Sequence, residues 1–241
     1  MYLPHLHYDT LSSTNDLAKT IGRFTGPHVF PKGLCISADV QTSGRGQFER
    51  RWVSPPGGVY FSFLSFRPPS SLLRSEEGND LKGRRWSLSV AEGFDPSEAA
   101  TPGQSPQAAG LGNLGSKGRQ PLELSPVSLR SNAAQRNEEI PYLIGLRLQS
   151  WLSKNFQIEA HVKPPNDLLV NGRKLCGILV EKVSRGEVSF WVVGIGLNLN
   201  QELFPDFLPD ATSLSLLSGK TYDNYAIIES LIEECVLWFG A

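Results

Sequence analysis

A glycine-rich loop that carries three arginines is the part of the sequence best suited to chemistry. Its letters, QTSGRGQFERRW from position 41 to 52, include Gly44, Arg45, Gly46, Arg50 and Arg51. A guanidinium group offers forked donors that fit carboxylates and phosphates, and glycine lets the backbone come close to a ligand. The pattern is neither a P-loop nor a dinucleotide-binding fingerprint. Taken alone it is equally typical of a solvated basic loop.

Two lysines and an acid lie further along the chain, around a hairpin signal. The letters KPPNDLLVNGRK, positions 163–174, include Lys163, Asn166, Asp167 and Lys174 around a central Asn-Gly turn. Such a hairpin projects the lysines at its two bases toward one site, and Asp167 is suited to ligate Mg²⁺ or to orient a lysine. This charge set favours an anionic substrate pair, such as a carboxylic acid and ATP. Ordinary surface charges would explain either lysine if it stood alone.

The elements that must position these groups include both helices and strands. Cap-type residues followed by apolar residues at helical spacing predict a helix from about Ser12 to Gly22, with Gly22 able to end it. Strands are predicted for 32–41, which leads into the arginine loop, and for the aromatic run 58–66. The aromatic run, together with Trp52, is typical of core, although it is also able to line the apolar tail of a ligand.

The second half of the chain continues this pattern. We expect a buried helix over 138–156, two strands flanking the Asn-Gly turn, a further strand over 187–200 and an amphipathic helix over 225–239. The prediction is an α+β fold with a mostly antiparallel sheet and helices packed on one side. Residues 70–137 are rich in Gly, Pro and Ser without a period, so we expect an inserted, low-complexity and mostly disordered segment within one domain, 1–241.

Composition excludes several classes of protein. The 241 residues carry a net charge of −1, which argues against a broadly basic nucleic-acid binder. No apolar run approaches a membrane span, and the first residues do not resemble a signal peptide. Three well-separated cysteines, Cys35, Cys176 and Cys235, show no CxxC spacing. We therefore expect buried, reduced thiols in a cytoplasmic protein.

Six short motifs, taken together and in this order, resemble the biotin–protein ligases. They are STN (13–15), QTSGRGxxxRxW (41–52), SPPGGVYFS (54–62), KPPND (163–167), RKLCGILVE (173–181) and VGIGLNLN (193–200). The resemblance implies a catalytic domain with the class II synthetase-like fold of biotin and lipoate ligases. It also implies ATP-dependent biotinylation, through biotinyl-5′-AMP, of a lysine on the biotin carboxyl-carrier domain of acetyl-CoA carboxylase. Mg²⁺ would accompany the ATP, and family members often pair through sheet edges as homodimers.

Matching the motifs position by position assigns expected roles. The biotin-binding residues would be Ser13, Thr14, Asn15, Gln41, Gly44, Arg45, Gly46, Gln47, Lys174, Gly177 and Gly196. The ATP and adenylate contacts would be Arg45, Arg50, Trp52, Lys163, Asn166 and Asn198. Arg45, Lys163 and Lys174 would be catalytic, with Arg45 at the ligand carboxylate and phosphate, and Asp167 would contact Mg²⁺. The glycine-rich loop would act as a lid, while Thr14 and Asn15 have a helix cap as their alternative explanation.

The sequence departs from the family at three positions and at both ends. Gln47 stands where Arg or Lys is usual, Glu49 replaces Gly, and Pro164 replaces the Trp of KWPND. The first two changes predict looser retention of the adenylate. We expect neither an N-terminal DNA-binding domain nor the small C-terminal barrel domain common in the family. Two alternatives stay open at this point: a lipoate ligase or octanoyltransferase on the same fold, and a non-catalytic protein that binds biotin or a carrier.

Overall fold

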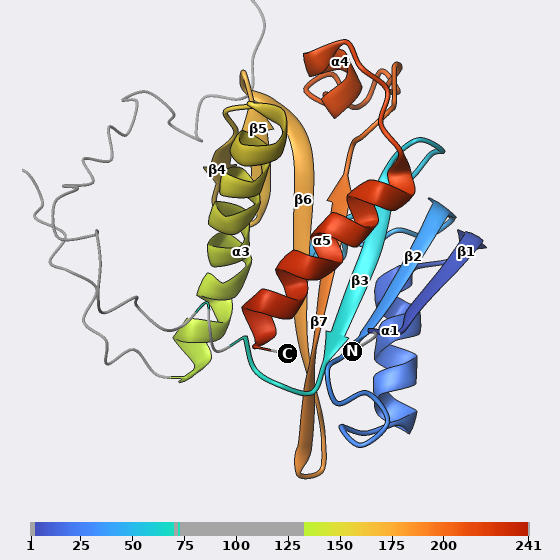
Figure 1. Cartoon of the computed structure of the whole chain (residues 1–241), viewed down its shortest axis with the longest axis vertical. Helices are drawn as coiled ribbons and strands as arrows, with labels where there is room; N and C mark the ends of the chain where they lie inside the picture. Colours follow the sequence, from blue (N-terminus) through green and yellow to red (C-terminus); the bar gives the residue numbers. More distant parts are fainter. Residues whose placement is uncertain (1–2, 70–71, 73–132, 241) are drawn as a thin grey trace, which may run out of the picture. The chain divides into compact units, whose positions relative to one another are not determined.

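A mixed sheet of seven strands organises the computed structural model, which describes residues 3–69, 72 and 133–240 (Figure 1). The strands are β1 (His5–Leu11), β2 (Leu34–Gln41), β3 (Val59–Ser65), β4 (His161–Lys163), β5 (Asp167–Val170), β6 (Arg173–Arg185) and β7 (Val188–Leu197). Their spatial order is β1-β2-β3-β7-β6-β5-β4. Only β1 and β2 pair in parallel within this described sheet. The predicted α+β fold with a mostly antiparallel sheet is therefore confirmed.

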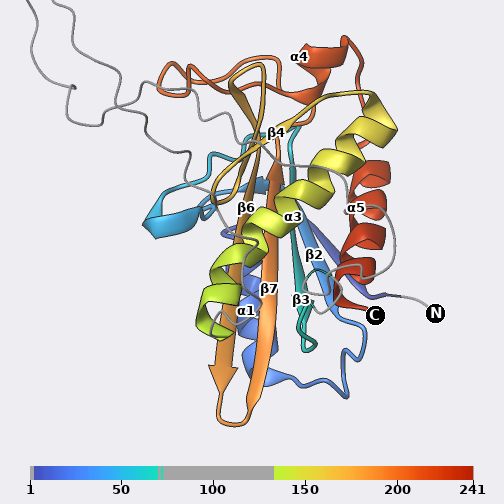
Figure 2. The same ribbon diagram turned by 90° about the vertical axis from the view of Figure 1, so that its left-hand side faces the viewer.

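Helices cover both faces of the sheet. The helices are α1 (Thr14–Phe24), α3 (Ala133–Phe156), α4 (Leu214–Ser218) and α5 (Asn224–Phe239), with a short 3₁₀ turn at Gln47–Glu49. The long helices α3 and α5 pack on one face, where they share a core with Phe61, Phe63 and Val193 (Figures 1 and 2). Helix α1 packs on the other face, against Leu64 and Val192. The fold differs here from the expected one-sided arrangement.

The central strands explain why two helix layers form. Strand β3 is buried at every position, so its alternate side chains need a partner layer on each face. The apolar stripe of α1, including Ala18, supplies that layer on the second face. A run of aromatic residues does not show this alternation clearly in the sequence, because both faces of the strand are apolar.

Helix α1, Thr14–Phe24, begins and ends two residues later than the predicted helix from Ser12 to Gly22. The Ser13 hydroxyl caps it by accepting a hydrogen bond from the Asp16 amide at 3.3 Å. Gly22 does not end the helix. A Cβ atom there would lie 2.5 Å from the Phe190 ring, so this glycine serves the close packing of α1 on β7.

The Asn-Gly turn forms the predicted hairpin between β5 and β6. Asn171 and Gly172 both have positive φ, 52° and 76°, as a two-residue turn of this kind requires. Strand β4 pairs with β5 so that Lys163 lies opposite Asp167. The hairpin thus brings the lysine-bearing segments next to each other at one edge of the sheet.

Other predictions fall partly outside the described residues. Most of the expected insert, 70–137, lies there, but α3 begins at Ala133, so the last residues assigned to the insert are helical. The strands 34–41 and 59–65 and the helix 224–239 match their predictions closely. Strands β1 and β4 and helix α4 were not predicted. The described part of the chain contains no helix that is long and apolar enough to cross a membrane.

Candidate active site

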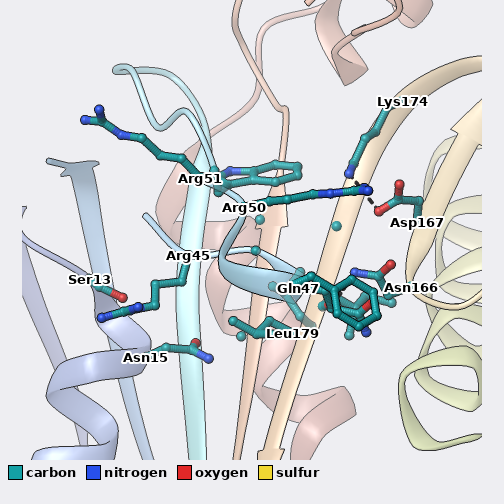
Figure 3. Close-up of a pocket in the computed structure, with 18 of the residues that line it drawn as sticks. Ser13, Asn15, Arg45, Gln47, Arg50, Arg51, Asn166, Asp167, Lys174 and Leu179 are labelled. Atoms are coloured by element: carbon teal, nitrogen blue, oxygen red, sulfur yellow. Dashed lines mark hydrogen bonds and ion pairs between the residues drawn. The ribbon is translucent and has the colours of Figure 1, made fainter. Parts of the chain in front are cut away.

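A cavity of about 340 Å³ lies between the arginine loop, the start of α1 and the β4–β6 region. Its lining combines segments that are far apart in the sequence. From the predicted site it includes Ser13, Thr14, Asn15, Gln41, Arg45, Gly46, Gln47, Arg50, Trp52, Lys163, Asn166, Asp167, Lys174, Gly177 and Gly196. Two predicted residues, Gly44 and Asn198, are not part of that lining. The structure therefore brings together nearly the whole predicted set (Figure 3).

The arginine loop is folded into a hairpin beside the cavity. Isolated bridges join Gln41 to Ser54 and Arg45 to Arg51. Within the loop, the Trp52 amide donates to the Gly44 carbonyl at 2.9 Å. A Cβ atom on Gly44 would lie 2.5 Å from the Trp52 carbonyl oxygen, so this glycine allows the two arms of the loop to meet. Its role in the structure is to shape the loop.

Two glycines of the sheet leave space for the Trp52 ring. A Cβ atom on Gly177 would lie 2.6 Å from the Trp52 ring, and one on Gly196 would lie 2.5 Å from it. The indole therefore occupies the space that these glycines open on the cavity floor. Its Nε1 atom is buried and has no hydrogen-bond partner among the described residues. In this structure the Trp52 ring fills the space at these two glycines, which were expected as biotin contacts.

One end of the cavity is built from neutral polar side chains. The Gln41 amide oxygen accepts from the Thr14 amide at 2.9 Å, while Gln41 Nε2 donates to Ser54 Oγ at 2.9 Å. The Asn15 amide donates to Glu181 at 2.9 Å and its oxygen accepts from Ser62 Oγ at 2.5 Å. These contacts hold each amide in one orientation, because donor and acceptor are both specified.

Within the described part of the chain, several groups at this end still have donors available. Gln41 and Asn15 each use one of two amide N–H groups in the contacts above. The Ser13 hydroxyl accepts from the Asp16 amide, which leaves its O–H available. Ser13 and Asn15 are both buried and both line the cavity. This end is therefore suited to a ligand group that accepts hydrogen bonds.

The opposite end of the cavity carries cations. Lys174 Nζ lies 2.7 Å from Asp167 Oδ1 and 5.1 Å from the centre of the Trp52 ring. Arg50 extends toward this pair, whereas Arg51 points away from it (Figure 3). Arg51 instead donates to the Thr42 carbonyl at 2.6 Å. Lys174 is thus held between a carboxylate and an aromatic face.

Arg45 lies elsewhere than expected. Its side chain is directed toward Ser13 and away from Lys174 (Figure 3), and its Nε donates to Asp16 Oδ2 at 2.7 Å. The expected clamp on a ligand carboxylate beside Lys174 is therefore not the arrangement in this structure. Arg50 is the arginine that extends toward the Lys174 end.

Asp16 and two further charged residues were missed by the sequence analysis. Asp16 Oδ1 lies 3.0 Å from Lys19 Nζ, which in turn lies 2.8 Å from Glu181 Oε1. Burial acts to raise the pKa of Asp16, but Arg45 and Lys19 outweigh it, so that pKa lies below its usual value. Burial likewise opposes the charge of Lys19, yet Glu181 and Asp16 raise its pKa. The available signals were the three-residue spacing of Asp16 and Lys19 on a helix and the β-strand period that places Glu181 on the face of Gly177.

Two predicted nucleotide contacts use their amides to position backbone. Asn166 Nδ2 donates to the Ile178 carbonyl at 2.8 Å, which fixes the β4–β5 turn against β6. Asn198 Nδ2 donates to the Thr212 carbonyl at 3.0 Å and to the Lys174 carbonyl at 3.3 Å. Asn198 therefore supports the backbone of Lys174 from behind the cavity.

The arrangement around Asp167 does not fit a magnesium ion held by the protein. Asp167 is the one carboxylate among the described residues of the lining, and it pairs with Lys174. Mg²⁺ prefers several oxygen ligands and retains waters. In the described part of the chain, the group of three carboxylate and imidazole side chains close enough to share an ion is His7, Asp9 and Asp39, which are exposed on β1 and β2 and are not part of the lining.

Comparison with known proteins places this geometry in context. A family model described as the biotin/lipoate A/B protein ligase family matches residues 9–76 and 130–198, more than half of the chain. The bifunctional ligase/repressor BirA of Bacillus subtilis (strain 168) is 27% identical over 231 residues, covering 94% of this chain and 51% of that protein. The biotin–[acetyl-CoA-carboxylase] ligase of Mycobacterium tuberculosis is 42% identical over 77 residues, covering 32% of this chain and 27% of that protein.

A solved structure shares the fold. The biotin protein ligase of Aquifex aeolicus in complex with biotin and ATP aligns with a TM-score of 0.58 at 22% identity, covering 96% of this chain and 68% of that one. The chain spans about half the length of the Bacillus relative. The two matched segments contain both the arginine loop and the lysine hairpin that line the cavity.

Proposed function

The chain belongs to the biotin/lipoate A/B protein ligase family, and from this we propose that it attaches biotin to a lysine of a carrier domain at the expense of ATP. Biotin combines three chemical parts: a ureido head with a carbonyl acceptor, an apolar tail and a carboxylate. The cavity has the matching order, with donors near Ser13 and Asn15, the Trp52 indole on a glycine floor, and cations around Lys174. This order is the observation that carries the proposal.

The donor end favours biotin over lipoate. A lipoyl head group is a dithiolane, whose sulfur atoms are weak acceptors. Such a head would leave the Ser13 O–H and the second N–H of the Asn15 amide unsatisfied in a buried place, which costs about 1–3 kcal/mol for each group. A ureido carbonyl is a strong acceptor and fits those donors. The family match alone includes both classes of substrate.

In the first step, a biotin carboxylate oxygen attacks the α-phosphorus of ATP. The new bond is P–O, the bond to the β-phosphate breaks, and pyrophosphate leaves. Both reactants are anionic, so the cations must offset their repulsion and the charge that develops on the phosphoryl oxygens. Lys174 and Arg50 are placed for this role, and Lys163 lines the same cavity from β4. Mg²⁺ enters this proposal with ATP as part of the substrate.

In the second step, a lysine amine of the carrier attacks the acyl carbon of biotinyl-5′-AMP. An amide bond forms, the mixed anhydride bond breaks, and AMP leaves as the amine loses a proton. The name of the Mycobacterium relative supports acetyl-CoA carboxylase as the source of the carrier. Folding the arginine loop over the intermediate would limit its hydrolysis by excluding water.

Exchange of radiolabelled pyrophosphate into ATP tests the proposal, because it reports the first step without a carrier. We expect exchange that depends on biotin and is absent with lipoate or octanoate. Exchange that runs faster with lipoate would overturn the assignment. Biotin binding in a titration without any exchange or carrier labelling would instead favour a non-catalytic binding protein. The acetyl-CoA carboxylase carrier, the cytoplasmic location and the homodimer stay predictions.

A further inference from the structure

We propose that Asp16 is a positioning residue that holds Arg45 in the free protein and releases it to an anionic ligand. The proposal rests on the function proposed above. It begins from one contact: Arg45 Nε lies 2.7 Å from Asp16 Oδ2, on the first turn of α1. With this contact formed, the Arg45 side chain is directed toward Ser13 and away from Lys174 (Figure 3), so it has to leave Asp16 to meet a ligand carboxylate beside Lys174.

The contact is of a kind that exchanges readily. The Arg45 side chain is 53% exposed and that of Asp16 is 32% exposed, so water screens the pair. Ion pairs of this exposure contribute about 1 kcal/mol or less. A ligand carboxylate or phosphate that meets Arg45 inside the cavity is less screened and therefore competes well with Asp16.

Lys19 lowers the free-energy cost of separating Arg45 from Asp16. Its Nζ lies 3.0 Å from Asp16 Oδ1 and is only 15% exposed as a side chain. When Arg45 leaves, Asp16 keeps this partner and is not stranded as an unpaired charge. Glu181 holds Lys19 in place at 2.8 Å and also binds Asn15 at 2.9 Å.

The same chain of contacts joins the loop to the donor end of the cavity. It runs from Arg45 through Asp16, Lys19 and Glu181 to Asn15. The residue that is proposed to face the biotin head is thus connected to the residue that controls the loop. A ligand that occupies both ends of the cavity acts on both ends of this chain.

Asp16→Asn removes the negative charge and keeps the side-chain shape. We expect this variant to bind biotin up to about fivefold more tightly, since a competitor worth about 1 kcal/mol is lost. Its affinity for biotinol, which lacks the carboxylate, should not change. Asp16→Glu should behave as the unaltered protein. In the double variant Asp16→Asn/Arg45→Ala, the gain in biotin affinity should vanish, because Arg45 transmits it.

Trypsin cleavage in the arginine loop gives a second readout that needs no ligand. We expect the free Asp16→Asn protein to be cut after Arg45, Arg50 and Arg51 several-fold faster than the unaltered protein, at an unchanged melting temperature. Faster cleavage without biotin binding would support the Asp16 contact while refuting the proposed function. Equal cleavage, equal losses for biotin and biotinol, or a gain that survives Arg45→Ala would overturn the role of Asp16.

Discussion

At the scale of single residues, two cations of the site are paired with carboxylates. Lys174 pairs with Asp167, and Arg45 pairs with Asp16. The Asp167 contact keeps the long, flexible Lys174 side chain at the cationic end of the cavity, which reduces the entropy that substrate binding must offset. The Asp16 contact instead holds Arg45 away from Lys174.

Lys174→Gln should separate chemistry from folding. We expect the rate of pyrophosphate exchange to fall at least about 100-fold, because a preorganised charge at a developing anion contributes on that scale. Lys182→Gln is a matched control. Lys182 lies on the same strand β6, its Nζ lies 5.3 Å from the centre of the Trp191 ring, and it is outside the cavity lining. Isothermal titration of biotin with and without ATP would locate the loss. Equal exchange in the two variants would remove Lys174 from the site.

We expect Gln47 to weaken the retention of the proposed intermediate, biotinyl-5′-AMP, because it supplies no positive charge. Gln47 lines the cavity at the start of the 3₁₀ turn, where a cation would stand near the adenylate phosphate. If a charge there is worth about 1 kcal/mol, Gln47→Arg should slow the release of biotinyl-5′-AMP by roughly fivefold or more. A stopped-flow measurement of adenylate dissociation checks this. An unchanged off-rate would mean that the loop retains the adenylate without that charge.

At the scale of elements, the central strands β6 and β7 do more than form the sheet. Gly177 and Gly196 pair directly across these strands and together seat the Trp52 ring. The arginine loop is thereby anchored through Trp52 to two neighbouring strands of the sheet. The position of the loop therefore depends on glycine at both positions, because a side chain at either one would displace the Trp52 ring.

Gly196→Ala should displace Trp52 and with it the loop. The added methyl would lie 2.5 Å from the indole, closer than any ordinary contact, and overpacking of this kind costs about 1–3 kcal/mol. We expect weaker biotin binding, read by titration, and a changed tryptophan fluorescence. The double variant Gly196→Ala/Trp52→Ala, compared with Trp52→Ala alone, provides the control, since without the ring the added methyl should no longer lower the melting temperature. Failure of that rescue would show that the cost arises elsewhere on β7.

The elements were predictable to the extent that they leave a local signal. The Asn171-Gly172 turn follows from the backbone preferences of two residues and was found. A helix start among the cap-type residues was also found, although the cap is Ser13 and not Thr14 or Asn15. Strand β1 was missed because its burial is mostly low and no apolar alternation marks it. The face on which α1 packs was missed because the sequence of β3 does not distinguish two buried faces.

At the scale of the whole molecule, the site was predictable as a set of residues and only in part as a geometry. Six motifs named nearly all of the residues that the fold brings to one cavity. The motifs do not determine side-chain directions, however. Arg45 pairs with Asp16, and Asn198 faces the 211–213 backbone, because of competing partners that become neighbours only after folding. Contacts between separate segments require the three-dimensional structure.

Burial of all three thiols gives the molecule a predictable weakness at high pH. Burial raises the pKa of Cys35 and Cys235 well above the usual value, and that of Cys176 to about 12. The folded state thus keeps these protons when the unfolded chain has lost them.

The stability of the folded state is unaffected by these thiols below about pH 9. It falls as the pH rises from there toward 12, by about 1.4 kcal/mol per pH unit for each thiol. The Tyr60 hydroxyl, whose pKa is also raised by burial, adds to this loss above about pH 10. We therefore expect cooperative unfolding between about pH 10 and 12, followed by circular dichroism. The slope of the unfolding free energy against pH should become less steep in Cys176→Ala, and a slope that does not change would show that other groups cause the alkaline transition.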